Sequence, residues 1–156
     1  MYIEKARPST CLFCEAPCTQ DEDKSLLLYR GKSVFTLMNL FPYNPGHLMI
    51  APYRHVDDLV KLSPDEQLEL IQEAARSTTL LREAMNPDGF NVGINQGKVA
   101  GAGIEDHLHV HVVPRWNGDT NFMPILGATK VIPEHLASTY HKLASLFRLD
   151  SEMRRE

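Results

Sequence analysis

The segment His107-Leu108-His109-Val110-His111-Val112-Val113 alternates imidazole and aliphatic side chains from its first residue to Val112. Because successive side chains of a strand point to opposite faces, this alternation predicts a β-strand over residues 107–113. The three imidazoles then share one face of the strand, and the aliphatic side chains share the other. Neighbouring histidines would lie about 6.6 Å apart and the outer two about 13 Å apart, so one metal ion can reach two adjacent imidazoles but hardly all three.

Three interpretations of these histidines follow from the residues alone. They can be a polar, half-exposed strand face without a function. They can form a His-x-His metal centre that activates water. Alternatively, one imidazole is a nucleophile, and its neighbours orient and assist it. The glycine-rich loop 96–103 stands just before the strand and favours a ligand site over a bare surface.

Other strands are indicated by short β-branched or aromatic runs that end at turn residues. In chain order they span residues 26–30, 33–37, 47–51 and 90–94. Gly31-Lys32 between the first two is typical of a two-residue hairpin turn. Pro52 is expected to end the third strand, and Pro114 to end the histidine strand, because proline has no backbone donor.

A long helix is predicted over residues 64–85 by the start signal Ser63-Pro64-Asp65-Glu66 and the stop signal 86–89. Its expected core face consists of Leu68, Ile71, Ala75, Thr78, Leu81 and Met85. The segment 20–24 is read as a solvated loop. A second helix is predicted to begin at Pro133 and to bury Leu136, Tyr140, Leu143, Ala144 and Phe147.

Five strands with a long helix inserted among them predict an α+β fold. We expect a mainly antiparallel five-stranded sheet that is covered on one face. The length of 156 residues predicts a single domain over residues 1–156. Within it, residues 1–25 form an N-terminal segment, and residues 150–156 form a charged tail.

Composition excludes several classes of protein. With 43% hydrophobic and 23% charged residues, the chain resembles an ordinary globular protein. A net charge of -4 without a Lys/Arg run predicts no nucleic-acid partner, although a local site for an anionic small molecule is allowed. No apolar run approaches the ~20 residues of a spanning helix, so no membrane association is expected. An odd cysteine count and a polar start predict a cytoplasmic location.

All three cysteines lie at the start of the chain, at Cys11, Cys14 and Cys18. This clustering excludes a disulfide framework. Taken alone, the Cys-x-x-Cys pair can be a redox pair, half of a zinc site, or two buried small residues.

Several motifs together resemble the histidine triad (HIT) family of nucleotide hydrolases and transferases. The family's His-x-His-x-His pattern is matched at 107–113, and its proline-glycine-histidine motif at Pro45-Gly46-His47. Asn39 stands eight residues before His47, where the family has asparagine or aspartate. Residues 100–104 and 114–124 are similar to the bacterial diadenosine tetraphosphate phosphorylase (ATP adenylyltransferase) branch.

The resemblance implies a HIT-like homodimer that acts on dinucleoside polyphosphates, with phosphate as acceptor. By resemblance, His109 attacks the α-phosphorus and forms a covalent nucleotidyl-histidine, while His111 contacts phosphate oxygens or the leaving group. His47 supports this pair. Two alternatives remain open: a hydrolase of nucleoside phosphoramidates or dinucleoside polyphosphates, and a nucleotide-binding module with little turnover.

Nucleotide contacts are also implied by the resemblance. Asn39 matches the ribose-binding position, and Asn95 matches a phosphate-contacting amide. Gly101 and Gly103 would let backbone N–H groups approach phosphates. Ile104 replaces a hydroxyl residue of the hydrolases, which favours backbone or Lys98 contacts. Apolar positions around the purine, or alternatively simple core packing, are represented by Leu12, Phe13, Leu37 and Leu40.

The distal part of the site is implied only in outline. Trp116 and Asn121 stand where the distal nucleotide or a neighbouring subunit is contacted, or where a loop packs.

A structural Zn²⁺ site is the last implication of the resemblance. Relatives with the cysteine pair add a histidine downstream of the proline-glycine-histidine motif and the first triad histidine. The ligands here would be Cys11, Cys14, His55 and His107. Cys18 would replace one thiolate or be a spare buried thiol. A closed four-ligand site has no position for water, so the metal would anchor the N-terminal segment and leave the other two histidines for phosphate.

Overall fold

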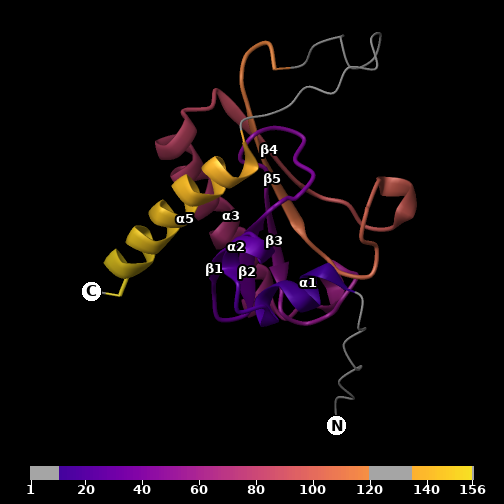
Figure 1. Ribbon diagram of the computed structural model, residues 1–156. Coiled ribbons are helices and arrows are strands. Elements are labelled where there is room, and N and C mark those ends of the chain that lie inside the picture. Colours follow the sequence, from indigo (N-terminus) through magenta and orange to yellow (C-terminus); the bar gives the residue numbers. More distant parts are fainter. Residues whose placement is uncertain (1–10, 120–134, 156) are drawn as a thin grey trace.

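The computed structural model describes residues 11–119 and 135–155. Its centre is one antiparallel five-stranded sheet with the strand order β1-β2-β3-β5-β4 (Figure 1). The strands are β1 (Leu27–Arg30), β2 (Val34–Met38), β3 (Leu48–Pro52), β4 (Gly89–Ile94) and β5 (Val110–Arg115). The expected α+β fold is confirmed, and the long helix connects β3 to β4 as predicted.

The central strand β5 differs from its predicted bounds at both ends. It begins at Val110, because the preceding segment pairs elsewhere: the backbone N–H of Leu108 donates to the Val56 carbonyl at 2.6 Å. It also continues through Pro114, which the sequence predicted to end it. The pairing of β5 with β3 stops at Val112, so Pro114 is paired with β4 alone. The backbone N–H that proline lacks is therefore not needed for pairing with β3.

The long helix α3 (Pro64–Met85) has the predicted bounds, and both hydrogen bonds of its capping box are present. Its predicted core face is wrong for Leu68 and Ile71, which are 57% and 60% exposed, and for Ala75, which is also exposed. The buried side chains are Leu70, Ala74, Ser77, Leu80, Leu81 and Ala84, together with Glu66, Glu73 and Arg76. Charged residues interrupt the apolar pattern of the buried face. The hydrophobic periodicity therefore predicted an adjacent face of the helix as the core face.

The C-terminal helix α5 (Leu136–Met153) packs against α3 and β1. Its expected start at Pro133 lies outside the described residues. The helix continues beyond residue 150, so the predicted tail begins too early. In this last part of the helix, Asp150 accepts from Nε of Arg76, which is buried on α3, at 2.6 Å. Arg76 also bonds the Glu73 carboxylate at 3.2 Å and the Phe147 carbonyl at 3.1 Å.

Short elements fill the connections. They are α1 (Leu12–Glu15), η1 (Ala16–Cys18), α2 (Glu22–Ser25), η2 (Leu59–Lys61) and η3 (Lys98–Ala100). The segment 20–24, read as a loop, contributes to α2, whose first turn is capped by the Asp21 side chain. The hairpin connection between β1 and β2 has three residues, 31–33, rather than two, because the Glu69 carboxylate accepts from the backbone N–H groups of Lys32 and Ser33.

Two apolar clusters cover opposite faces of the sheet. The helix face carries α3 and α5, and its core includes Leu108, Val110 and Val112, as their alternation predicts. The opposite face, called here the histidine face, carries α1 and a smaller core: Cys11, Phe13, Cys14, Ala16, Leu27, Phe35, Leu37, Met49 and Ala51. Figure 1 shows α5 and α1 on different sides of the strands.

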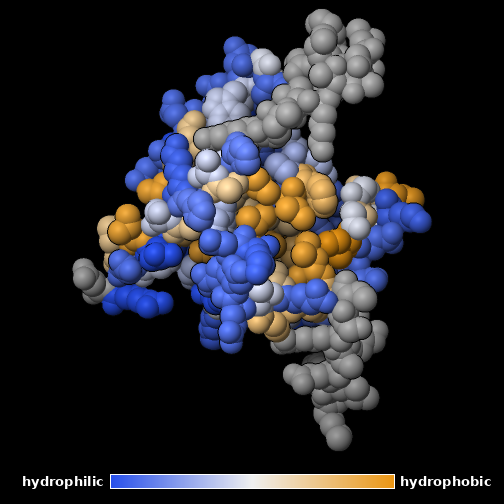
Figure 2. Space-filling view, viewed as in Figure 1, coloured by the Kyte–Doolittle hydropathy of each residue, from blue (hydrophilic) through white to orange (hydrophobic). Residues whose placement is uncertain are grey.

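In the view of Figure 2, hydrophobic residues gather near the middle of the molecule, over the region of the strands, and hydrophilic residues surround them. Among the described helices, none combines the length and apolar character needed to cross a bilayer.

Candidate active site and metal site

His109 is held in a single tautomer by the backbone. Its Nδ1 lies 2.8 Å from the carbonyl oxygen of His107. Because a carbonyl oxygen only accepts, Nδ1 must carry the proton and donate, so Nε2 keeps its lone pair. The ring is buried and packs on Phe13 with 4.6 Å between ring centroids. Burial lowers the pKa of His109, which keeps the imidazole neutral and nucleophilic.

A second chain of hydrogen bonds sets the tautomers of His47 and His111. The backbone N–H of Tyr43 donates to Nδ1 of His47 at 3.2 Å, and the Asn39 side-chain amide lies 3.3 Å from the same atom. Nδ1 is therefore an acceptor, so Nε2 of His47 carries the proton and donates to Nδ1 of His111 at 2.9 Å. A neutral His111 then has its own proton on Nε2.

The lowered pKa values of His47 and His111 agree with neutral imidazole rings. Burial, and then the proximity of His111 and His109, lower the pKa of His47 to about 4. Burial, followed by His109, lowers the pKa of His111 to about 4. The rings of His109 and His111 meet edge to face with 4.7 Å between centroids. A nucleophilic nitrogen and an N–H donor thus stand side by side.

Four potential metal ligands, including the first triad histidine, lie close together. The ligand atoms of Cys11, Cys14, His55 and His107 all lie within 4.8 Å of one another. Nδ1 of His107 lies 3.4 Å from Sγ of Cys11, 3.6 Å from Sγ of Cys14 and 3.2 Å from Nδ1 of His55. Ligands at normal zinc distances from one tetrahedral ion are separated by roughly 3.3 to 3.8 Å. The spacing therefore fits one tetrahedral ion.

The tautomer of His107 also fits a metal ligand. Its Nε2 lies 2.8 Å from the Pro52 carbonyl oxygen and must donate to it, which leaves the Nδ1 lone pair facing the thiols. Burial lowers the pKa of His107 to about 4. Cys18 does not belong to this cluster: it is exposed, and its thiol donates to the Cys14 carbonyl at 3.4 Å. The alternative that Cys18 is a buried spare thiol is therefore wrong.

The residues expected at the phosphates lie next to the triad strand. Asn95 directly follows β4, and its amide reaches the Gly101 carbonyl at 3.5 Å. Gly101 has a φ of 87°, which favours glycine. Gly103 has no such constraint, and a Cβ built there meets nothing within 4 Å. The loop is thus open to a ligand on the side of these glycines.

The residues expected around the base are divided between core and surface. Phe13 and Leu37 are 0% and 2% exposed and belong to the core of the histidine face. Leu12 and Leu40 are exposed and offer apolar surface. The Asn39 side-chain oxygen accepts from the backbone N–H of Phe41 at 2.9 Å, so part of its hydrogen-bonding capacity holds the β2–β3 loop.

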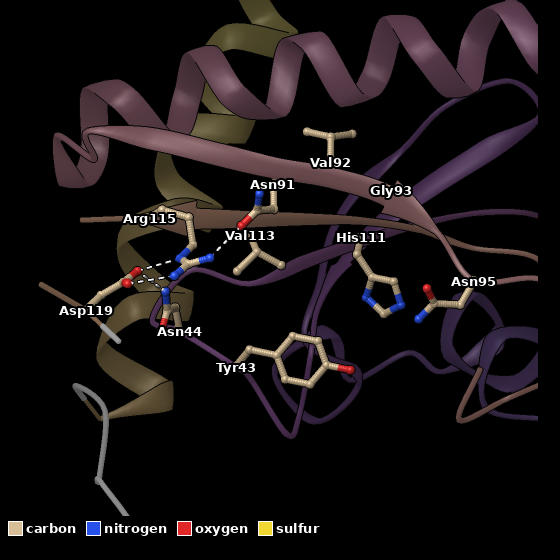
Figure 3. Close-up of a pocket in the computed structure, with 10 residues that line it drawn as sticks. All are labelled: Tyr43, Asn44, Asn91, Val92, Gly93, Asn95, His111, Val113, Arg115 and Asp119. Atoms are coloured by element: carbon tan, nitrogen blue, oxygen red, sulfur yellow. Dashed lines mark hydrogen bonds and ion pairs between the residues drawn. The ribbon is translucent and has the colours of Figure 1, made fainter. Parts of the chain in front are cut away.

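A pocket of about 400 Å³ adjoins His111 on the histidine face (Figure 3). Its lining residues are Tyr43, Asn44, Asn91, Val92, Gly93, Asn95, His111, Val113, Arg115 and Asp119. Sequence reasoning did not single out Tyr43, Asn44, Asn91 or Asp119. One available signal was the alternation of Asn91 and Gly93 on β4 with Asn95 directly after it, which places all three on one face.

Trp116 is not among the lining residues of this pocket, although its backbone N–H donates to Asp119 at 3.2 Å. It lines a separate hollow with the end of α3 and Lys142 of α5. Asn121 and the rest of the expected segment up to Pro124 lie outside the described residues.

Comparisons with known proteins agree with this arrangement. Residues 20–118 match the protein family described as "HIT domain". The chain is 47% identical over 133 residues to the AP-4-A phosphorylase of Mycobacterium tuberculosis, covering 85% of this chain and 68% of the relative. It is 29% identical over 128 residues to the bis(5'-nucleosyl)-tetraphosphatase [asymmetrical] of Schizosaccharomyces pombe, covering 82% and 66% of the two chains.

Solved structures give the same picture. The crystal structure of a Zn-bound histidine triad family protein from Mycobacterium smegmatis has a TM-score of 0.71 at 25% identity, covering 92% of this chain and 97% of that one. Fold, histidine arrangement and sequence identity lead to one conclusion, namely that this chain belongs to the HIT family and resembles its AP-4-A phosphorylase branch.

Proposed function

We propose that this protein is a nucleotidyltransferase that phosphorolyses dinucleoside polyphosphates through a covalent nucleotidyl-His109. The observation that carries the proposal is the hydrogen bond from His109 Nδ1 to the His107 carbonyl, because it directs the lone pair of a neutral imidazole outward from Nε2. The 47% identical relative named AP-4-A phosphorylase supports phosphate as the acceptor.

Two displacements complete the reaction. In the first, Nε2 of His109 attacks the α-phosphorus, a P–N bond forms, and the P–O bond to the leaving nucleotide breaks. The Nε2–H of His111 donates to the departing oxygen and offsets its charge. In the second, a phosphate oxygen attacks the same phosphorus, and the P–N bond breaks. Diadenosine tetraphosphate and phosphate would thus give ATP and ADP.

His47 acts through His111 as a positioning residue. It occupies the only hydrogen bond available to Nδ1 of His111, so the proton of a neutral His111 must be on Nε2. The Asn95 amide and the backbone N–H groups at Gly101 and Gly103 would bind phosphate oxygens. Asn39 would hold the ribose, and Leu12 and Leu40 would contact the base, with Phe13 and Leu37 forming the floor behind it.

Cys11, Cys14, His55 and His107 would hold a structural Zn²⁺. When bound, the ion would cross-link the N-terminal segment to the triad and supply no open position for water. The zinc-bound M. smegmatis neighbour supports this choice of metal. His107 has two functions in this arrangement: its side chain is a ligand, and its carbonyl fixes the tautomer of His109.

The single domain would assemble as a homodimer and work in the cytoplasm on a nucleotide substrate, without nucleic-acid or membrane partners. The exposed Leu68 and Ile71 on α3 and the exposed Val92 on the edge strand β4 support a dimer, since apolar side chains on adjoining elements suit an interface. Light scattering of the purified protein checks this, and Leu68→Lys should weaken the dimer. A monomer at micromolar concentration would contradict it.

Product analysis with diadenosine tetraphosphate tests the activity. With phosphate present, ADP and ATP are expected in equal amounts. AMP and ATP would indicate the hydrolase alternative, which the tetraphosphatase relative represents. The absence of products would favour a nucleotide-binding module.

Substitution of His109 tests the mechanism. His109→Asn should abolish trapping of a labelled nucleotidyl-enzyme and reduce turnover by at least about a thousandfold. His141→Asn is the matched control, because His141 is an exposed histidine on α5. A surviving adduct in His109→Asn would refute the assignment of the nucleophile.

Gly103→Ala tests the phosphate loop. A Cβ at this position meets no protein atom within 4 Å, so stability should not change. If phosphates approach the backbone here, the methyl group blocks them, and KM for the dinucleotide should rise. An unchanged KM would place the phosphates elsewhere.

A further inference from the structure

The pocket beside His111 extends away from the proposed nucleophile along β4 and β5. Figure 3 shows His111 and Asn95 at one end, and Arg115, Asp119, Asn44 and Asn91 at the other. His111 and Arg115 are four residues apart on β5, which corresponds to about 13 Å along a strand. The pocket therefore begins at His111, where the leaving nucleotide would separate from the α-phosphorus. From there it continues along β5 as far as Arg115.

The far end of the pocket is polar, but its charges are matched. Arg115 donates to both oxygens of Asp119, from Nε at 2.6 Å and from Nη2 at 2.7 Å. Its Nη1 donates to the side-chain oxygen of Asn91 at 2.6 Å, and Asn44 donates to Asp119 at 2.7 Å. A phosphate bound here would be repelled by the Asp119 carboxylate, whose charge already neutralises Arg115. This end therefore suits a neutral polar group better than a phosphate.

The walls suit a flat, neutral ligand. Tyr43 is 69% exposed and faces the strands across the pocket, which places an aromatic ring on the outer side (Figure 3). On the inner side, Gly93 has no side chain, and a Cβ built there meets nothing within 4 Å. Since Asn91 uses its oxygen for Arg115, its amide nitrogen is left as a donor without a partner among the described residues.

We propose that this pocket binds the nucleoside of the leaving nucleotide, with the base against Tyr43 and its polar edges or ribose hydroxyls at Asn91 and the Arg115–Asp119 pair. This inference rests on the proposed function, because it identifies the second half of a dinucleotide substrate. Nucleosides combine an aromatic face with neutral donors and acceptors, which is the chemistry that these walls recognise.

One consequence concerns the order of events. The acceptor phosphate must approach the nucleotidyl-histidine from the side that the leaving group has vacated, beside His111 and Asn95. The leaving nucleotide, anchored by its nucleoside, must therefore dissociate before phosphate enters.

The test compares diadenosine tetraphosphate with adenosine 5'-tetraphosphate, which lacks the second nucleoside and ends in a phosphate group instead. In Tyr43→Ala, KM for the dinucleotide should rise roughly tenfold relative to KM for the single nucleotide. In Asn91→Ala the relative rise should be roughly fivefold. Tyr43→Phe should restore the preference, since the ring is retained.

Asn117→Ala is the matched control, because Asn117 is an exposed asparagine outside the pocket lining. Equal increases in KM for both substrates would overturn the proposal, since they would mean that Tyr43 and Asn91 act on the polyphosphate or on the histidines. Unchanged KM values would overturn it as well.

A binding measurement separates this proposal from the proposed activity. Calorimetry with His109→Asn, which cannot form the adduct, should show tighter binding of the dinucleotide than of adenosine 5'-tetraphosphate, and Tyr43→Ala in that background should remove the difference. If wild-type protein turned over neither substrate but this preference remained, the activity would be wrong and the nucleoside pocket would stand. Equal affinities would refute the pocket alone.

Discussion

The two faces of the sheet bury polar side chains by opposite means. On the helix face, the Arg76 guanidinium lies between the carboxylates of Glu73 and Asp150, so charge is matched by charge. On the histidine face, His47 and His109 are buried as neutral rings, and backbone groups determine which nitrogen carries the proton. The difference decides what each face can do.

A matched ion pair uses the hydrogen-bonding capacity of both partners. Arg76 also donates to the Phe147 carbonyl and the Ser151 hydroxyl, and Tyr29 covers its guanidinium at 4.0 Å. Nothing in this group is left for a substrate. A neutral imidazole held through one nitrogen keeps the other nitrogen available. The buried ion pair of the helix face therefore holds α5 in place. The histidine face leaves an imidazole nitrogen available to a ligand.

The largest expected effect on stability comes from the metal ligands. Cys14→Ala, or chelation of the wild-type protein, should lower the melting temperature by more than about 10 °C, because structural zinc sites contribute several kcal/mol to folding. Differential scanning calorimetry with metal analysis measures this. Cys18→Ala, a substitution of the exposed cysteine outside the cluster, is the control. A protein that melted unchanged without metal would exclude the four-ligand site.

Next in size is the ion pair of the helix face. Arg76→Ala should cost about 3–5 kcal/mol of unfolding free energy, since it leaves two carboxylates without their buried partner. Urea unfolding provides the value. Turnover per folded molecule should not change, because the guanidinium belongs to the helix face. A parallel loss of turnover in fully folded protein would contradict the division between the faces.

Acidification should destabilise the histidine face. The pKa of His47 is lowered to about 4 in the folded protein, against about 6.5 unfolded, so the unfolded chain binds the proton more readily in this window. Stability present above pH 6.5 is therefore lost as pH falls toward 4, on the order of 3 kcal/mol for His47. The difference in unfolding free energy between wild type and His47→Gln, measured from pH 7 to 4.5, isolates this contribution.

Glu73 on the helix face should respond with the opposite sign. Burial raises the pKa of its carboxyl, although Arg76 and Thr36 favour the charged form. A raised carboxyl pKa means that protonation stabilises the folded state, so Glu73→Gln should lose stability relative to wild type as the pH falls through the titration of this carboxyl. Equal pH slopes for both proteins would contradict this sign.

The smallest effect is expected from Thr36→Val. The Thr36 hydroxyl donates to Glu73 at 2.9 Å, and removing this charge-assisted bond should cost about 1.5–3 kcal/mol. Urea unfolding of Thr36→Val and of the double variant with Glu73→Gln gives the coupling between the two side chains. A coupling near zero would mean that the hydroxyl adds nothing to the buried group.

Sequence signals predicted those features of the structure that depend on residues close together in the chain. The bounds of α3 follow from a capping box and a proline-glycine stop, all within a few residues of its ends. The core face of α3 was wrong because a buried Arg76 is acceptable only with Asp150, which is 74 residues away. No periodicity within the helix contains that partner.

The site shows the same division. Alternation predicted that Leu108, Val110 and Val112 share a face, and they do. It did not predict that β5 starts only at Val110, because His107 and Leu108 bond the carbonyl groups of Pro52 and Val56 instead of continuing the strand. The pocket beyond His111 combines Tyr43, Asn91 and Asp119 from three separate segments, and only the fold brings them together.

The cluster of candidate metal ligands has a consequence for the order of folding. Cys11 and His107 are separated by 96 positions, so this contact closes most of the chain into one loop. During synthesis, the thiols of Cys11 and Cys14 must wait until residue 107 has left the ribosome before the last ligand of the set is present. Docking of α1 through this cluster therefore cannot precede the synthesis of His107, and the rate at which α1 becomes protected should depend on zinc concentration.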